Sequence, residues 1–191
     1  LTQNKMTVVE LCTLSGKTSS MDAEGLELLT FGALCNNSTL TGTFHDWKAT
    51  GDPTEQALVL AAAQAGKVKA ALENLFPRVE EYPFDSARKL MTTVHRLGGG
   101  RYRIITKGAP DVLVRRCTSV REEGTVLPMT PLKNKRLGKM NEQMAGRALR
   151  VLGVAYRDAD SLPRNLESLE QGLTFCGMIG MIDPPRPQAK G

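Results

Sequence analysis

A lysine and a glycine stand where a strand-like segment meets the expected start of a helix. In RIITKGAPDVLVRRC, residues 103–117, a hydrophobic run ends in Lys107 and Gly108, and Pro110 suits the first position of a helix. Helix N-termini carry partial positive charge and attract anions. Gly108 has no side chain, which allows a ligand to approach the backbone. These residue types predict an anion-binding site near Lys107.

Two other segments contain residues of the kinds that bind a nucleotide, which needs a flat apolar surface for its base and cations for its phosphates. FDSARKLM offers Phe84 with Arg88 and Lys89 close behind. The neighbouring proline and polar residues favour a strand edge for Phe84, although the local sequence is also compatible with a core position. GRALR adds Arg147 and Arg150 at the start of an expected strand.

Several other kinds of site are disfavoured by the sequence. SGKTSS, residues 15–20, is reminiscent of a phosphate-binding loop, but Leu11 occupies the position of the first glycine, so a surface turn is expected. His45 and His95 lack nearby partners for a nucleophile–base system, so the chain alone is not expected to be a complete enzyme. The cysteines have no metal-ligand spacing and are expected to be buried, reduced thiols: Cys12, Cys35, Cys117 and Cys176.

The composition indicates a globular domain with a mildly basic surface. Of its 191 residues, 41% are hydrophobic and 24% are charged, with a net charge of +5. No apolar run approaches the roughly 18 residues of a membrane span. Basic residues cluster in PLKNKRLGK, residues 131–139, without interleaved aromatic residues, which favours a solvated helix face over a nucleic-acid groove. The missing initiator Met suggests an excised piece of a longer protein.

The order of the elements predicts an α+β domain, an antiparallel β-sheet of about six or seven strands flanked by helices. One helix has clear boundary signals: Asp52 is placed to cap it, Pro53 opens it, Glu55 follows in the first turn and Gly66 can end it. Strands are expected over 5–14, 78–84, 89–97, 101–107, 147–157 and 172–182, with a hairpin over 118–128; helices are expected over 22–35, 53–66, 67–75 and 130–146, with a short one from Pro110 and a polar loop over 36–51.

Five segments of the chain resemble, in the correct order, motifs of one protein family. LTQNKMTV is similar to the continuation of D-K-T-G-T-L-T, GDPTEQAL to G-[ED]-x-T-E-x-A-L, FDSARKLM to a Phe segment ending in [KR]-[KR]-x-M, KGAPDVLVRRC to K-G-A-P-[ED]-x-[IVL] with a trailing Cys, and MIDPPRP to D-P-P-R. These are motifs of the nucleotide-binding domain of P-type cation-transporting ATPases, and the resemblance is closest to the calcium-pump-like (type II) group. It covers essentially the whole chain. Heavy-metal pumps usually carry a His-Pro pair here, whereas neither His45 nor His95 precedes a proline.

The resemblance implies a role for each matched position. Phe84 would stack on adenine, and Lys107 would lie deep in the pocket beside the base and ribose. Lys89 and Arg150 would reach the phosphates. Glu55 would bond to the adenine amino group or orient the lysines, with helix capping as the alternative role. The full implied set is Glu55, Phe84, Lys89, Lys107, Gly108, Ala109, Arg150 and Leu152.

The resemblance also implies how the chain fits into a larger protein. Residues 1–8 would be a hinge strand from the phosphorylation domain, 9–180 the nucleotide-binding domain and 181–191 the hinge back. The ligand would be ATP, as Mg-ATP in the full pump, and the partners the phosphorylation and actuator domains.

The expected location is a cytoplasmic domain of an integral membrane protein, without direct membrane or nucleic-acid contact and monomeric when excised. The phosphorylated aspartate would precede Leu1, so this chain is expected to bind ATP without hydrolysing it. Two alternatives stay open, a free-standing non-catalytic nucleotide-binding module and a basic domain that binds nucleic acid.

Overall fold

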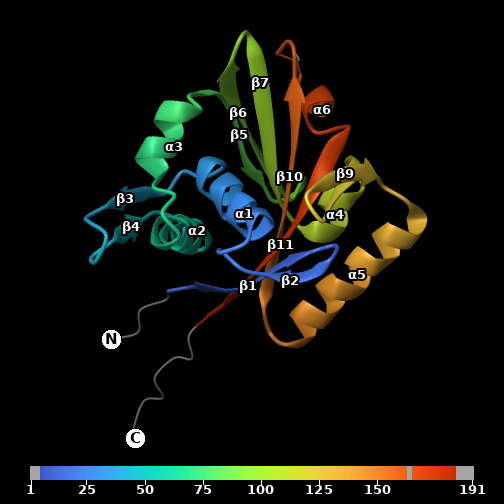
Figure 1. The fold of residues 1–191 in the computed structure, drawn as a ribbon, viewed down its shortest axis with the longest axis horizontal. Helices are drawn as coiled ribbons and strands as arrows, with labels where there is room; N and C mark the ends of the chain where they lie inside the picture. The colour runs from blue at the N-terminus through green and yellow to red at the C-terminus, as the bar shows by residue number, and fades with distance from the viewer. Residues whose placement is uncertain (1–4, 163–164, 184–191) are drawn as a thin grey trace, which may run out of the picture.

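A nine-stranded sheet forms the centre of the described chain (Figure 1). The computed structural model describes residues 5–162 and 165–183. The main strand order across the sheet is β2-β1-β11-β10-β7-β6-β5, and β8 pairs with both β11 and β9. The strands are β1 (Thr7–Thr13), β2 (Gly16–Thr18), β5 (Arg78–Asp85), β6 (Leu90–Gly98), β7 (Arg101–Gly108), β8 (Cys117–Glu122), β9 (Thr125–Pro128), β10 (Arg150–Ala159) and β11 (Leu173–Ile182).

Helices cover both faces of this sheet, and a separate hairpin lies beside them. In Figure 1, α1 to α3 lie on one side of the sheet, whereas α4 and α5 lie on the other. The hairpin consists of β3 (Thr39–Thr41) and β4 (Lys48–Thr50). The helices are α1 (Ala23–Leu34), α2 (Pro53–Gln64), α3 (Lys69–Leu75), α4 (Pro110–Val114), α5 (Pro131–Gly146) and α6 (Leu166–Leu169).

The predicted fold class is confirmed, with several differences in detail. The strand pairs of the sheet are antiparallel except β8 with β11, which is parallel. The sheet has nine strands rather than about six or seven. SGKTSS, expected as a surface turn, supplies β2, and the expected polar loop contains β3 and β4. Strands of three residues are too short to show a hydrophobic alternation.

The core has two main parts because the central strands are buried on both faces. Neighbouring residues of β10 point to opposite sides: Val154 packs with α1 and α2, whereas Ala155 packs with α4 and α5. Every residue from Leu173 to Met181 in β11 is buried. This confirms the prediction that the last apolar strand is covered on both sides.

The predicted helix boundaries hold where the sequence carries capping residues. The carboxylate of Asp52 accepts a hydrogen bond from the Glu55 N–H at 3.1 Å, with Pro53 as the first residue of α2. The Thr130 hydroxyl accepts from the Lys133 N–H at 3.2 Å at the start of α5. Helix capping was the alternative role for Glu55. The side chain that caps α2 is that of Asp52, which bonds to the first turn.

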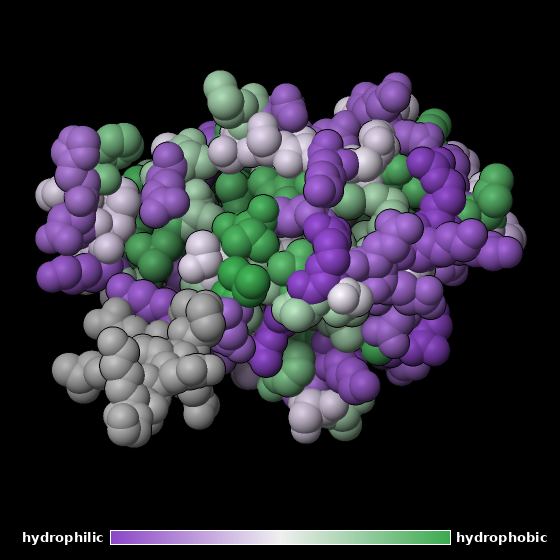
Figure 2. Space-filling view, turned by 90° about the horizontal axis from the view of Figure 1, so that it is seen from below, coloured by the Kyte–Doolittle hydropathy of each residue, from purple (hydrophilic) through white to green (hydrophobic). Residues whose placement is uncertain are grey.

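The exposed face of α5 agrees with the prediction of a solvated helix. Only Leu137 and Met144 are buried in this helix, among the residues that the structure describes. Figure 2 views the molecule from below, and its right-hand part, where α5 lies in Figure 1, is mainly hydrophilic. Hydrophobic residues gather nearer the middle of the same face. None of the described helices is long and apolar enough to cross a membrane.

His95, which is completely buried in β6, makes the stability of the fold depend on pH. Its Nδ1 lies 2.9 Å from the Phe76 carbonyl oxygen, and its Nε2 lies 2.8 Å from the Thr93 hydroxyl. Burial lowers the pKa of His95 to about 4, and the nearby Arg78 and Arg103 guanidinium groups also disfavour the charged imidazole. The unfolded chain therefore binds more protons than the folded chain between about pH 4 and 6.5.

Lowering the pH through this window is expected to remove about 3 kcal/mol of stability through His95 alone. Urea unfolding of the wild-type chain and of His95→Gln at several pH values between 6.5 and 4 measures this contribution. The wild-type free energy of unfolding should fall more steeply with acidification, because the variant lacks the titrating imidazole. Parallel curves for the two chains would show that His95 titrates alike in both states.

Candidate functional site

One pocket contains every site residue implied by the sequence resemblance. Its volume is about 580 Å³, within the range typical of small-molecule sites. The first turn of α2, the connection between β5 and β6, the end of β7 and the start of β10 form its walls. Its lining comprises the implied set Glu55, Phe84, Lys89, Lys107, Gly108, Ala109, Arg150 and Leu152 together with Asn37, Asp52, Thr54, Ser86, Met91 and Val151.

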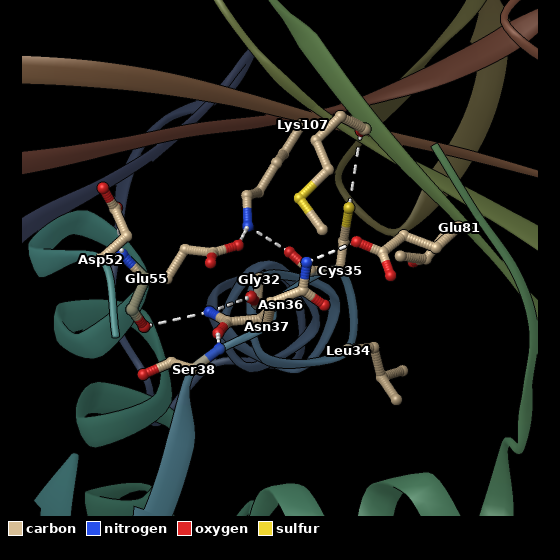
Figure 3. Close-up of polar contacts among 12 residues, drawn as sticks. Gly32, Leu34, Cys35, Asn36, Asn37, Ser38, Asp52, Glu55, Glu81 and Lys107 are labelled. Carbon is tan, nitrogen blue, oxygen red and sulfur yellow. Dashed lines mark hydrogen bonds and ion pairs between the residues drawn. The ribbon is translucent and has the colours of Figure 1, made fainter. Parts of the chain in front are cut away.

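A buried ion pair occupies the inner part of this pocket. The Lys107 Nζ lies 2.6 Å from a carboxylate oxygen of Glu55, and the two side chains are 7% and 13% exposed. Lys107 Nζ also donates a hydrogen bond to the Cys35 carbonyl oxygen (Figure 3). β7 supplies the lysine, α2 the glutamate and the end of α1 the carbonyl. Three elements thus meet at one ammonium group.

The ion pair keeps hydrogen-bonding capacity for a ligand. An ammonium group has three N–H donors. Within the described chain, Lys107 Nζ uses two of them, on Glu55 and Cys35. The bond from Lys107 reaches only one oxygen of the Glu55 carboxylate. The pair can therefore offer one donor and further acceptor sites to a bound molecule without being broken.

Phe84 provides an accessible aromatic surface at the pocket. It lies near the end of β5, an edge strand of the sheet, and is 60% exposed. The predicted strand-edge position is confirmed, and the alternative core position is excluded. A large exposed ring that lines a pocket can stack on a planar ligand.

The connection between β5 and β6 is packed tightly against the end of β7. Lys89 has a left-handed backbone conformation with φ of 62°. The Ala109 N–H donates to the Lys89 carbonyl oxygen at 3.2 Å. A Cβ atom on Gly108 would lie 2.2 Å from the same oxygen, so this position requires glycine. Gly108, which was expected to let a ligand approach the backbone, is thus also needed for the packing of β7 against the connection between β5 and β6.

The prediction of an anion at the mouth of a helix is not supported. The helix after Gly108, α4, has only five residues. The ammonium group of Lys107 is paired with Glu55 and Cys35. Lys107 therefore belongs to the inner part of the pocket, and the exposed cations of the lining come from other elements.

The structure separates two neighbouring pairs of basic residues. Arg150 lines the pocket, and its Nη1 donates to the Thr54 hydroxyl at 3.3 Å. Arg147 is not among the lining residues, and its guanidinium forms two hydrogen bonds of 2.8 Å with the Glu10 carboxylate. Lys89 lines the pocket, whereas Arg88 forms an ion pair with Glu170. Lys89 and Arg150 are thus the outer cations of the site.

Six lining residues were not part of the implied set. Ser86 and Met91 lie inside the motif FDSARKLM, and Val151 lies between the implied residues Arg150 and Leu152, so these neighbours could have indicated them. Asp52 was interpreted only as a helix cap, and Thr54 lies two residues after it in the motif GDPTEQAL. Asn37 comes from the segment after α1, far from every motif, and local sequence carries no signal for it. Its Nδ2 donates to a carboxylate oxygen of Glu81 at 2.5 Å (Figure 3). Its Oδ1 accepts a hydrogen bond from the Arg78 Nη1 at 2.6 Å.

Comparisons with known proteins show the family of this chain. Residues 25–188 match the family described as "P-type ATPase, cytoplasmic domain N". A calcium-transporting ATPase of Bacillus subtilis is 36% identical over 100% of this chain, which corresponds to 24% of that protein. Calcium-transporting ATPase 1 of Lactococcus lactis is 39% identical over 97% of the chain and 21% of its own length. A sodium/potassium exporting P-type ATPase of Schizosaccharomyces pombe is 34% identical over 87% of the chain and 16% of its length.

The chain spans about a quarter or less of the curated relatives it matches. The family description agrees with the predicted cytoplasmic location, and the calcium-transporting relatives agree with the predicted calcium-pump-like group. The chain belongs to the family of the cytoplasmic N domain of P-type ATPases.

Proposed function

We propose that this chain binds ATP for a P-type cation pump and presents the γ-phosphate to an aspartate of a neighbouring phosphorylation domain. The observation that carries the proposal is the convergence, in one pocket, of an exposed aromatic ring, a buried lysine–glutamate pair and two outer cations. This combination matches the parts of ATP, which has a planar base at one end and a polyanion at the other.

The residues have distinct roles in the proposed complex. The adenine stacks on Phe84, with its amino group directed to the Glu55 carboxylate. Lys107 contacts the base and ribose through its remaining N–H donor. Lys89 and Arg150 attract the phosphates, because both line the outer part of the same pocket. The walls are completed by backbone and apolar side chains: Gly108, Ala109 and Leu152.

Delivery of the γ-phosphate depends on how the domain is joined to the rest of the pump. The first residues of β1 and the last of β11 are neighbours, since Thr7 pairs with Ile182. Both connections of residues 9–180 therefore leave from one place, an arrangement suited to a hinge. The proposed hinges are residues 1–8 and 181–191, of which 1–4 and 184–191 lie outside the described residues. Transfer to the aspartate would depend on positioning and electrostatics.

The proposed parent protein is a cation-transporting ATPase. The matched relatives are named for calcium transport and for sodium and potassium export. The proposed partners are the phosphorylation and actuator domains of the same pump. In this arrangement the chain supplies binding and orientation, and the neighbouring domain supplies the reacting aspartate.

Binding is expected to be weak, with a dissociation constant of about 0.1 to several mM. Stacking of one base contributes about 1–3 kcal/mol, and charged hydrogen bonds contribute about 1.5–3 kcal/mol each. Association opposes these gains with a cost of at least about 4 kcal/mol. A weak complex suits a domain that releases its nucleotide in every cycle.

Phe84→Ala is expected to weaken ATP binding about 5- to 150-fold, because it removes the stacking surface. NMR titration of the chain with ATP measures the change. Phe44→Ala is the matched control, since Phe44 is 65% exposed but lies in the connection between β3 and β4. The control should bind like the wild type. Failure of millimolar ATP to shift resonances near Phe84 and Lys107 in the wild-type chain would contradict the proposed function itself.

A further inference from the structure

The segment that follows α1 collects three cationic side chains on its backbone carbonyls. Lys107 donates to the carbonyl oxygen of Cys35. Lys69 donates to that of Asn36 at 2.8 Å, and Arg78 donates to the same oxygen at 2.6 Å. The carbonyl groups at a helix C-terminus carry partial negative charge, which stabilises nearby cations. The segment is therefore fixed by charged contacts from α3, β5 and β7.

Asn36, at the centre of this segment, joins the end of α1 to the start of α2. Its side chain is completely buried. Its Nδ2 donates to the Gly32 carbonyl oxygen at 3.1 Å and to the Glu55 carbonyl oxygen at 3.0 Å. Its Oδ1 accepts from the Ser38 N–H at 2.8 Å. Figure 3 shows these bonds directly below the Glu55–Lys107 pair. Both amide N–H groups and the amide oxygen are thus used.

Asn36 is connected to the carboxylate of Glu55 through the backbone of Glu55 itself. The bond to the Glu55 carbonyl fixes the backbone of the residue whose side chain holds Lys107. The Cys35 carbonyl, one residue before Asn36, holds the same ammonium group from the other side. Displacement of α2 relative to α1 would therefore change both contacts of Lys107 together.

We infer that Asn36 is a positioning residue for nucleotide binding, which acts by fixing Glu55 and, through it, Lys107. The inference rests on the proposed ATP-binding function and adds a residue that does not line the pocket. A buried amide with every hydrogen-bonding group used holds its neighbours in one arrangement. The competing account is that Asn36 only closes the end of α1 and contributes to stability.

A double-mutant cycle on the ATP dissociation constant separates these accounts. The four chains are the wild type, Asn36→Ala, Glu55→Gln and the double variant. Asn36→Ala alone should weaken ATP binding about tenfold. In the Glu55→Gln background it should change the affinity less than twofold, because the carboxylate that it positions has already been replaced. An equal loss of affinity in both backgrounds would overturn the inference.

Two further variants separate a change in ATP affinity from a loss of stability. Asn36→Ser keeps a small polar side chain that is too short to donate to both carbonyl oxygens and adds no buried charge, and it should give the same coupling if the alanine variant does not fold. Ile104→Val destabilises the core beside Val94 and Leu169, away from the pocket, and should bind ATP like the wild type. If the wild-type chain itself does not bind ATP, the proposed function fails; if it binds and the cycle is additive, only the role of Asn36 fails.

Discussion

Glu170→Ala is expected to lower the free energy of unfolding by about 3–5 kcal/mol, because it leaves the Arg88 guanidinium, whose side chain is only 15% exposed, without its partner. Glu170 is only 2% exposed, and its two carboxylate oxygens lie 2.9 Å and 3.1 Å from the Arg88 Nε. It also accepts a hydrogen bond from the Thr92 hydroxyl, which lies 2.8 Å from that of Thr106. Removal of one carboxylate therefore disrupts a connected buried network.

An exposed ion pair with the same shortest Nε–oxygen distance provides the matched control. The Arg101 Nε lies 2.9 Å from a carboxylate oxygen of Asp160, but the two side chains are 51% and 90% exposed. Asp160→Ala should leave the urea unfolding midpoint almost unchanged, because water solvates the remaining charge. Equal midpoint shifts for Glu170→Ala and Asp160→Ala would contradict the prediction that burial decides the cost.

A variant with both charges removed tests the cause of the loss. Arg88→Met with Glu170→Leu replaces the ion pair by apolar side chains of similar size, which is often close to neutral for a buried pair. It should recover most of the stability lost in Glu170→Ala. Failure to recover would show that the hydrogen bonds of Glu170 to Thr92, rather than the unpaired charge, dominate the loss.

The same network shows where prediction from sequence ends. In FDSARKLM, Arg88 and Lys89 both follow Phe84, the residue proposed to stack on the base. Because both are basic and adjacent, the segment alone does not show which of them faces the pocket. Only the fold shows that Arg88 meets Glu170, which is 82 residues away, whereas Lys89 lines the pocket. The choice depends on a tertiary contact that the local sequence does not encode.

Helices and strands with strong local sequence signals were predicted well. The start of α2 follows from Asp52 and Pro53, and β11 follows from its long apolar run. Six of the eight implied residues come from three motifs, and Arg150 and Leu152 come from the strand expected over 147–157; the fold brings all four segments to one pocket. Asn37 and Asn36 could not be predicted, because polar residues in a segment between helices resemble an ordinary loop. Their side-chain contacts form only when α1, α2 and β5 meet.

Lys107→Met is expected to reduce ATP binding about 10- to 150-fold in the chain, because a charged hydrogen bond to the ligand is worth about 1.5–3 kcal/mol. In the proposed full-length pump, phosphorylation by ATP should slow by a similar factor at low ATP concentration. Phosphorylation by inorganic phosphate should be unchanged, since that reaction would not need the pocket proposed to hold adenosine. Equal loss of both reactions would contradict a role in nucleotide binding.

The substitution also leaves the Glu55 carboxylate, which is 13% exposed, without its ammonium partner, so stability and binding must be separated. Lys107→Met combined with Glu55→Gln removes the remaining charge and should recover much of the stability that Lys107→Met loses. It should not recover ATP binding, because the donor is still absent. Urea unfolding and ATP titration of both variants measure the two properties. If binding returned together with stability, Lys107 would act by holding the pocket together rather than by contacting the nucleotide.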